Sequence, residues 1–259
     1  MNVWTYWQGK RLPYIDVCLQ SMAKACKDVN FHLVTPNNLY DYIDKDTINP
    51  NFIKLRHPSK IADCVRAALL AKHGGWWWDA DTIGIQNPLA INEQHPDASV
   101  LYMTWTKKPR RILNGYIYMK KKTELARQWL YLINEKLKAD FESCNVWLSM
   151  GEKLLTPLLD NRTDCVEIER RLFLPIDIDS SVAKFFSTIE TKSHIQKDTI
   201  CFGLNHSWMF HNHKEAMEQM PKNWKKSKYL IHKLLDEART SKTEPKPVSV
   251  IKHPQIKLR

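Results

Sequence analysis

The chain has 259 residues, of which 43% are hydrophobic, enough for one large α/β domain with a sizeable core or for two small ones. Its 39 lysines and arginines outnumber its 28 acidic residues, and this net charge of +11 favours polyanionic partners such as nucleic acid, anionic membranes or phosphorylated substrates. The sequence has no apolar run of about 18 residues, which excludes a membrane-spanning helix, and it does not begin like a signal peptide. We therefore expect a cytoplasmic protein.

The first 36 residues have the pattern of a β-α-β unit. Residues 2–7 are predicted to form a strand that closes before a glycine, and residues 14–27 place apolar side chains at helical spacing. Residues 31–36 form a second short strand that ends at a proline. This opening predicts a parallel sheet covered by helices.

The clearest predicted helix covers residues 57–75, where apolar side chains recur with a period of about 3.6 residues. Ser59 is expected to cap its start, and Gly74 and Gly75 to end it. The three tryptophans of residues 76–78 then form a strand.

The rest of the chain continues to alternate between the two kinds of pattern, followed by a change in composition. Pro157 lies inside one short predicted helix, which is therefore either kinked or divided into two pieces. The further elements expected are strands at 99–105, 115–120 and 199–208, and helices at 123–138, 151–161 and 223–239. We assign residues 1–240 to a single domain and residues 241–259 to a basic, flexible tail. The six cysteines form no C-x-x-C pair, so reduced core residues are expected.

Two aspartates separated by one residue follow the tryptophan strand. Side chains alternate along an extended strand, so Trp77, Asp79 and Asp81 are expected to point the same way, with Trp76 and Trp78 on the buried side. Two carboxylates aimed at one point repel each other unless a cation lies between them, and oxygen ligands favour Mg²⁺ or Mn²⁺. A D-x-D at the carboxyl end of a strand therefore predicts a clamp for a cation and a diphosphate, with two solvated carboxylates in a turn as the alternative.

The preceding helix carries a possible partner for this clamp. Asp63 and Arg66 are three residues apart and so lie on one helix face. They either belong to the same site or form a surface ion pair worth less than about 1 kcal/mol.

The segment from Ser59 to Thr82 resembles the sugar-binding region of family 32 glycosyltransferases, which include capsular-polysaccharide sugar transferases, yeast α-mannosyltransferases and, more distantly, glucosylating clostridial toxins. Residues 3–21 are similar to the first strand and helix of that family, and residues 203–211 to its closing element. The positions that match the motif are Ala62, Asp63, Arg66, Gly74, Gly75, Trp77, Asp79 and Asp81.

The resemblance implies a GT-A fold, which is α/β with a Rossmann-like nucleotide-sugar-binding sheet and flanking helices. It implies a retaining hexosyltransferase that uses a nucleotide sugar, in particular a UDP-sugar, and Mn²⁺ or Mg²⁺. By the same resemblance Asp79 and Asp81 would be catalytic residues that bind the cation, and Asp63 and Arg66 would bind the donor sugar. Trp77 would lie beside the donor, and Trp7 would stack on the base.

The closing element supplies the remaining candidates. By the resemblance, Ser207 and Trp208 would reach the β-phosphate of the donor. His206 would be the third protein ligand of the cation, with Asn205 and Ser207 as alternatives. The acceptor would be a saccharide or a lipid-linked saccharide, and the basic tail would hold the protein at the inner face of an anionic membrane unless it is merely disordered.

Three other functions compete with this interpretation. A haloacid-dehalogenase-type phosphatase also uses D-x-D, but its threonine comes one position later than Thr82, and no second acidic motif follows. A nucleic-acid-binding protein would fit the charge, but the basic residues are spread along the chain, so no nucleic acid is expected. An inactive transferase-like domain would not need the intact acids.

Overall fold

The computed structural model describes residues 1–105, 111–146, 148–160, 162–176, 185, 194–205 and 229–240. The strands are β1 (Asn2–Tyr6), β2 (Asn30–Val34), β3 (Gly75–Trp78), β4 (Thr82–Gly84), β5 (Val100–Tyr102), β6 (Tyr116–Met119), β7 (Cys165–Glu167) and β8 (Cys201–Gly203). The α-helices are α1 (Pro13–Ala25), α2 (Pro58–His73), α3 (Leu89–Gln94), α4 (Glu124–Ala139), α5 (Phe141–Cys144), α6 (Glu152–Leu158) and α10 (Leu230–Thr240). Short 3₁₀ helices lie at η1 (Leu39–Asp41), η2 (Pro50–Lys54) and η3 (Arg170–Leu172).

The central feature is a six-stranded sheet in the order β2-β1-β3-β6-β5-β7. Strand β1 is parallel to both β2 and β3, and β5 is parallel to β7, whereas β6 is antiparallel to its neighbours β3 and β5. A separate antiparallel pair joins β4 to β8. The predicted fold class, α/β with a sheet flanked by helices, is confirmed.

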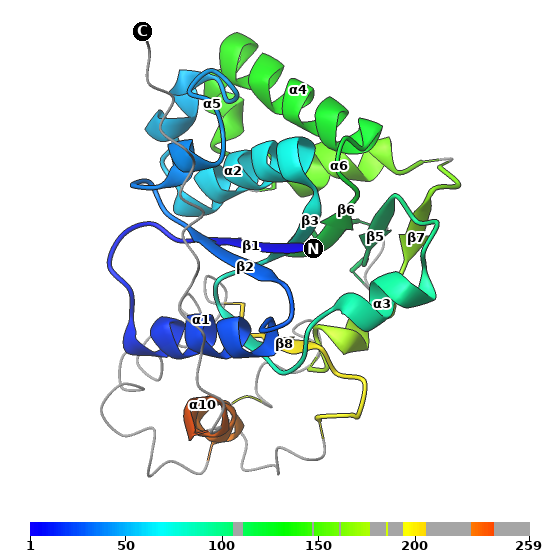
Figure 1. Ribbon diagram of the computed structural model, residues 1–259. Helices are drawn as coiled ribbons and strands as arrows, with labels where there is room; N and C mark the ends of the chain where they lie inside the picture. Colours follow the sequence, from blue (N-terminus) through cyan, green and yellow to red (C-terminus); the bar gives the residue numbers. More distant parts are fainter. Residues whose placement is uncertain are drawn as a thin grey trace, which may run out of the picture.

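The sheet separates two layers of helices (Figure 1). Helices α1 and α10 pack with Trp76 and Trp78 in one apolar core, while α2 and α4 pack with Trp77 in the other. All three tryptophans are at most 1% exposed. The predicted alternation along β3 is therefore correct, but both faces of the strand are buried rather than one.

Helix α2 begins two residues earlier than a Ser59 cap would allow, so the predicted cap is wrong. Pro58 occupies its first turn and His57 precedes it. Proline suits this position because its ring fixes φ near the helical value and its missing N–H would have no partner in the helix. The predicted end is confirmed, since Gly74 follows the last turn with φ +65° and its N–H donates to Leu70 O.

Other boundaries differ modestly from the sequence prediction. Within residues 199–205 of the late predicted strand, the extended part is β8, and residues 206–208 lie outside the described residues. Pro157 lies next to the end of α6, so the helix ends beside it and is not split in two. All six cysteines are free thiols, as predicted. Residues 223–228 of the last predicted helix and the tail at 241–259 lie outside the described residues. Within the described part of the chain, no helix combines the length and apolar character needed to cross a membrane.

Candidate active site

The candidate active site lies at the carboxyl end of β3. Asp79 follows this strand directly, and its backbone N–H donates to Gly115 O at 3.0 Å. Trp7 follows β1, which is the parallel neighbour of β3, so both residues lie at the same edge of the sheet. Because α1 and α2 cover opposite faces, the boundary between β1 and β3 is a topological switch point, where open α/β sheets bind ligands.

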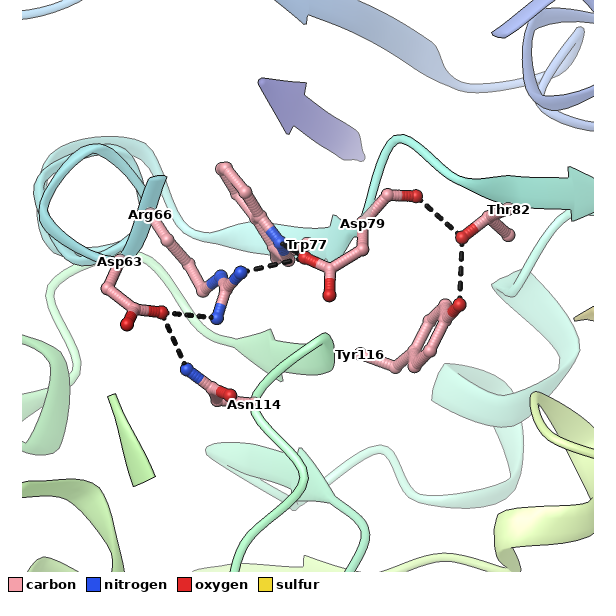
Figure 2. Close-up of polar contacts among 7 residues, drawn as sticks. All are labelled: Asp63, Arg66, Trp77, Asp79, Thr82, Asn114 and Tyr116. Carbon is pink, nitrogen blue, oxygen red and sulfur yellow. Dashed lines mark hydrogen bonds and ion pairs between the residues drawn. The ribbon is translucent and has the colours of Figure 1, made fainter. Parts of the chain in front are cut away.

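Arg66 joins the helix to the strand end. Its guanidinium donates from Nη1 to Asp63 Oδ1 at 3.0 Å and from Nη2 to Asp79 Oδ1 at 2.7 Å, and it lies between the two carboxylates (Figure 2). The Arg66 side chain is 4% exposed and that of Asp63 is 10% exposed, whereas 40% of the Asp79 side chain remains accessible. The alternative of a surface ion pair between Asp63 and Arg66 is therefore wrong. The structure instead links three of the predicted site residues.

Burial raises the pKa of Asp63, and the charges of Arg66 and Lys60 oppose that rise. Its Oδ1 also accepts a hydrogen bond from Asn114 Nδ2 at 2.9 Å. An added Cβ at Gly151 would lie 2.1 Å from Asn114 Nδ2 and 3.0 Å from Asp63 Oδ1, so a glycine is required beside this pair. Asp63 is thus held in one orientation by groups from three parts of the chain.

Trp77 contributes to the site through the edge of its ring. The indole Nε1–H donates to Asp79 Oδ1 at 2.8 Å, and the Arg66 guanidinium carbon lies 4.6 Å from the ring centroid. Such a stack suits a guanidinium, which is planar and weakly hydrated. Trp77 therefore contacts both the Asp79 carboxylate and the Arg66 guanidinium while remaining buried.

Asp81 departs from the predicted extended geometry. Strand β3 ends at Trp78 and the backbone bends at residues 80–81 before β4 begins. Asp81 lies close enough to Tyr14 and Cys18 of α1 to raise the pKa of both groups, after the larger effect of burial. Its carbonyl accepts a hydrogen bond from Leu204 N–H at 2.9 Å. The two carboxylates therefore approach the site from different sides, Asp79 next to α2 and Asp81 next to α1.

Sequence reasoning missed the residues that β6 brings to the site. Asn114 and Gly115 precede this strand and Tyr116 begins it, and the register pairs Tyr116 with Trp78. The hydroxyl groups of Tyr116 and Thr82 lie 2.8 Å apart beside Asp79 (Figure 2). An Asn-Gly pair immediately before an apolar strand was the available signal, but it does not say which strand the segment pairs with.

The residues present offer a partial set of cation ligands. Both Arg66 and Trp77 donate to Asp79 Oδ1. The other oxygen, Asp79 Oδ2, lies beside Gly115, and a Cβ at that position would come within 2.5 Å of it. The glycine thus keeps space open beside this oxygen, and carboxylate oxygens are suitable ligands for Mg²⁺ or Mn²⁺. Within the described ranges, no three His, Cys, Asp or Glu side chains group as a metal site. The predicted ligand His206 and the predicted donor-binding residues Ser207 and Trp208 lie outside those ranges.

A comparison with known families bears on this geometry. Residues 1–121 match the family described as "Capsular polysaccharide synthesis protein". This match confirms the resemblance to capsular-polysaccharide proteins and supports a transferase. The matched segment, residues 1–121, includes α2, β3 and β6, and therefore every described residue of the Arg66 network. No curated protein sequence matches the chain.

Solved glycosyltransferases give weaker likenesses. The PaToxG glycosyltransferase has a TM-score of 0.43 and 15% identity, over 61% of this chain and 68% of its own. The glycosyltransferase involved in the glycosylation of the major capsid of PBCV-1 has a TM-score of 0.42 and 12% identity, over 66% and 82%. GlyE of Streptococcus pneumoniae TIGR4, in its apo form, has a TM-score of 0.42 and 11% identity, over 66% and 45%. TM-scores this low do not establish a common fold.

Proposed function

We propose that this chain is a retaining, metal-dependent glycosyltransferase that moves a hexose from a UDP-sugar to a saccharide acceptor in capsular polysaccharide synthesis. The observation that carries the proposal is the position of Arg66, which joins Asp63 to Asp79 at the switch point of the sheet. The match of residues 1–121 to a capsular polysaccharide synthesis family supports the same reaction class.

The donor would bind across the crevice between β1 and β3. Asp63 would accept hydrogen bonds from hydroxyl groups of the sugar, since Arg66 and Asn114 both bind its Oδ1 and so fix the carboxylate in place. Trp7, at the end of β1, would stack on the base. Ser207 and Trp208 would approach the β-phosphate. These roles agree with an anionic donor drawn to a basic protein of net charge +11.

Asp79 and Asp81 would hold Mn²⁺ or Mg²⁺, with His206 as the third protein ligand. Such a cation neutralises charge on a diphosphate leaving group. The bond from the anomeric carbon to the diphosphate oxygen breaks, and a bond to the acceptor oxygen forms on the same face. The acceptor hydroxyl proton passes to the departing diphosphate oxygen, so no residue of the chain acts as a nucleophile. The hydrogen bond from Arg66 keeps Asp79 oriented during this exchange.

The acceptor would be a saccharide or a lipid-linked saccharide. Residues 241–259 hold more basic than acidic side chains and would attach the protein to an anionic membrane surface at the cytoplasmic side. Co-sedimentation with vesicles that contain anionic lipid tests this part of the proposal, because a chain lacking residues 241–259 should sediment less. Equal sedimentation of both chains would remove the tail from the proposal.

A panel of nucleotide sugars tests the reaction. The purified full chain should hydrolyse at least one UDP-sugar when Mn²⁺ is present and lose this activity when EDTA is added, as measured by release of UDP. Asp81→Ala should abolish the release. Sugar phosphates should not lose phosphate, which separates this activity from that of a phosphatase.

The matched control changes an aspartate far from the site. Asp44 is 74% exposed and pairs with Lys72 on the surface, so Asp44→Ala should leave UDP release unchanged. If no donor is cleaved or bound, or if Asp81→Ala equals the wild type, the proposed function is wrong.

A further inference from the structure

Three hydrogen bonds, two between backbone groups and one from a side chain, hold the turn that carries the two aspartates. Asp79 N–H donates to Gly115 O, and Asp81 O accepts from Leu204 N–H. The third bond comes from a side chain, because Thr82 Oγ1 donates to Asp79 O at 2.5 Å. The two backbone bonds reach residues next to β6 and β8, namely Gly115 and Leu204. The Thr82 bond joins two residues of the turn itself.

The direction of the hydrogen bonds around Thr82 follows from proton counting. A hydroxyl has one proton, and a carbonyl oxygen can only accept. Because the Thr82 hydroxyl donates its only proton to Asp79 O, the Tyr116 hydroxyl, 2.8 Å away, must donate to Thr82 Oγ1. The chain of bonds therefore runs from Tyr116 O–H to the Thr82 hydroxyl and on to the Asp79 carbonyl.

The surroundings of Tyr116 hold this chain in place. Tyr116 is 3% exposed, and Thr82 is fully buried. A Cβ on Gly203 would lie 2.3 Å from the Tyr116 hydroxyl oxygen, so this glycine of β8 leaves the space that the hydroxyl occupies. Burial raises the pKa of Tyr116 well above its usual range, and Asp81 and Asp79 add to that rise. Tyr116 is thus a neutral donor across the working pH range.

We infer that Thr82 and Tyr116 are positioning residues that set the spacing of Asp79 and Asp81 for a divalent cation. This inference rests on the proposed function. Neither side chain touches the cation or the donor in this scheme. Their effect passes through the Asp79 carbonyl, which fixes the backbone between the two carboxylates.

Three substitutions test this relay of hydrogen bonds from Tyr116 through Thr82 to the Asp79 carbonyl. Thr82→Val keeps the side-chain shape but removes both hydrogen bonds, so the affinity for Mn²⁺ in the presence of UDP should fall by about tenfold. Thr82→Ser restores the hydroxyl and should restore the affinity. Tyr116→Phe removes only the outer bond and should weaken Mn²⁺ binding by about threefold. The free Mn²⁺ signal in electron paramagnetic resonance measures binding without turnover.

The kinetic signature separates positioning from simple loss of fold. In Thr82→Val the Mn²⁺ concentration for half-maximal activity should rise, while kcat recovers at saturating Mn²⁺. Thr123→Val is the matched control, because Thr123 Oγ1 also donates to a carbonyl three residues earlier, Lys120 O, beyond the opposite end of β6. Thr123→Val should lower the melting temperature without changing the Mn²⁺ constant.

The outcomes distinguish the inference from the proposed function. If the wild type binds Mn²⁺ with UDP and Thr82→Val binds it equally well, the relay has no positioning role and the inference is wrong. If the wild type binds neither Mn²⁺ nor UDP, the result contradicts the proposed function rather than the positioning role of Thr82 and Tyr116. Should Thr82→Val not fold, Tyr116→Phe decides the question, and a Mn²⁺ constant equal to that of the wild type would overturn the inference.

Discussion

The substitution Arg66→Met should destabilise the protein strongly and in a pH-dependent way. It removes the guanidinium that pairs with Asp63 and Asp79 while keeping a long apolar side chain. Removing one partner of a buried ion pair costs about 3–5 kcal/mol, and we expect about 3 kcal/mol because water can solvate the 40% exposed Asp79 side chain. Urea unfolding followed by far-ultraviolet circular dichroism measures the change in the free energy of unfolding.

The pH dependence identifies Asp63 as the source of that loss. Burial already raises the pKa of Asp63, and without Arg66 the pKa rises further. The folded variant then binds more protons than the unfolded chain, so its free energy of unfolding falls as pH rises through the raised pKa. The deficit relative to the wild type should therefore be larger at pH 8 than at pH 5, the direction expected for a carboxyl that is neutral in the fold at low pH.

The exposed pair of Arg127 and Glu124 is the matched control. These side chains are 60% and 50% exposed and lie three residues apart on α4, as Asp63 and Arg66 do on α2. Arg127→Met should change the free energy of unfolding by less than about 0.5 kcal/mol at either pH. A loss in Arg66→Met no larger than that of Arg127→Met, or one independent of pH, would refute the reasoning.

Three further results are expected. Trp77→Phe should weaken UDP-sugar binding, measured by calorimetry, by about fivefold because Asp79 loses one donor, whereas Trp76→Phe should lower stability alone. Gly115→Ala should abolish donor binding in a folded protein, because its methyl group would lie 2.5 Å from Asp79 Oδ2; normal binding would contradict the proposed space beside this oxygen. Burial lowers the pKa of His32 to about 4, so the free energy of unfolding should fall by about 3 kcal/mol as pH drops from 6.5 to 4, and His32→Gln should flatten that dependence in urea titrations.

The sequence predicted those parts of the site that follow from local periodicity. The helical period places Asp63 and Arg66 on one face of α2, and the strand period separates Trp77 from Trp76 and Trp78. Their meeting with Asp79 also follows from order along the chain, since α2 leads directly into β3. These relations require no knowledge of distant contacts, which is why they could be anticipated.

The remaining parts depend on pairing that local patterns do not encode. Tyr116 and Asn114 reach the site because β6 pairs antiparallel with β3, and that choice depends on packing across the whole sheet. The position of Asp81 differs from the prediction because the backbone bends where Thr82 bonds Asp79 O, a bond that a strand pattern does not foresee. The Thr82 hydroxyl thus stabilises the bend that ends the extended backbone after β3.

Gly74, which follows α2, and Gly75, which begins β3, determine whether these residues can meet at all. Gly74 and Gly75 have φ values of +65° and +106°, a region that other residues seldom adopt. A Cβ on Gly74 would lie 2.4 Å from Lys121 N, and a Cβ on Gly75 would lie 2.4 Å from Asn2 O. Each glycine therefore allows a close approach, one to the chain after β6 and one to β1, and together they fix the register of β3. Because a shift by one residue would turn Trp77 to the opposite face, the glycines are as necessary to the Arg66 network as its charged groups.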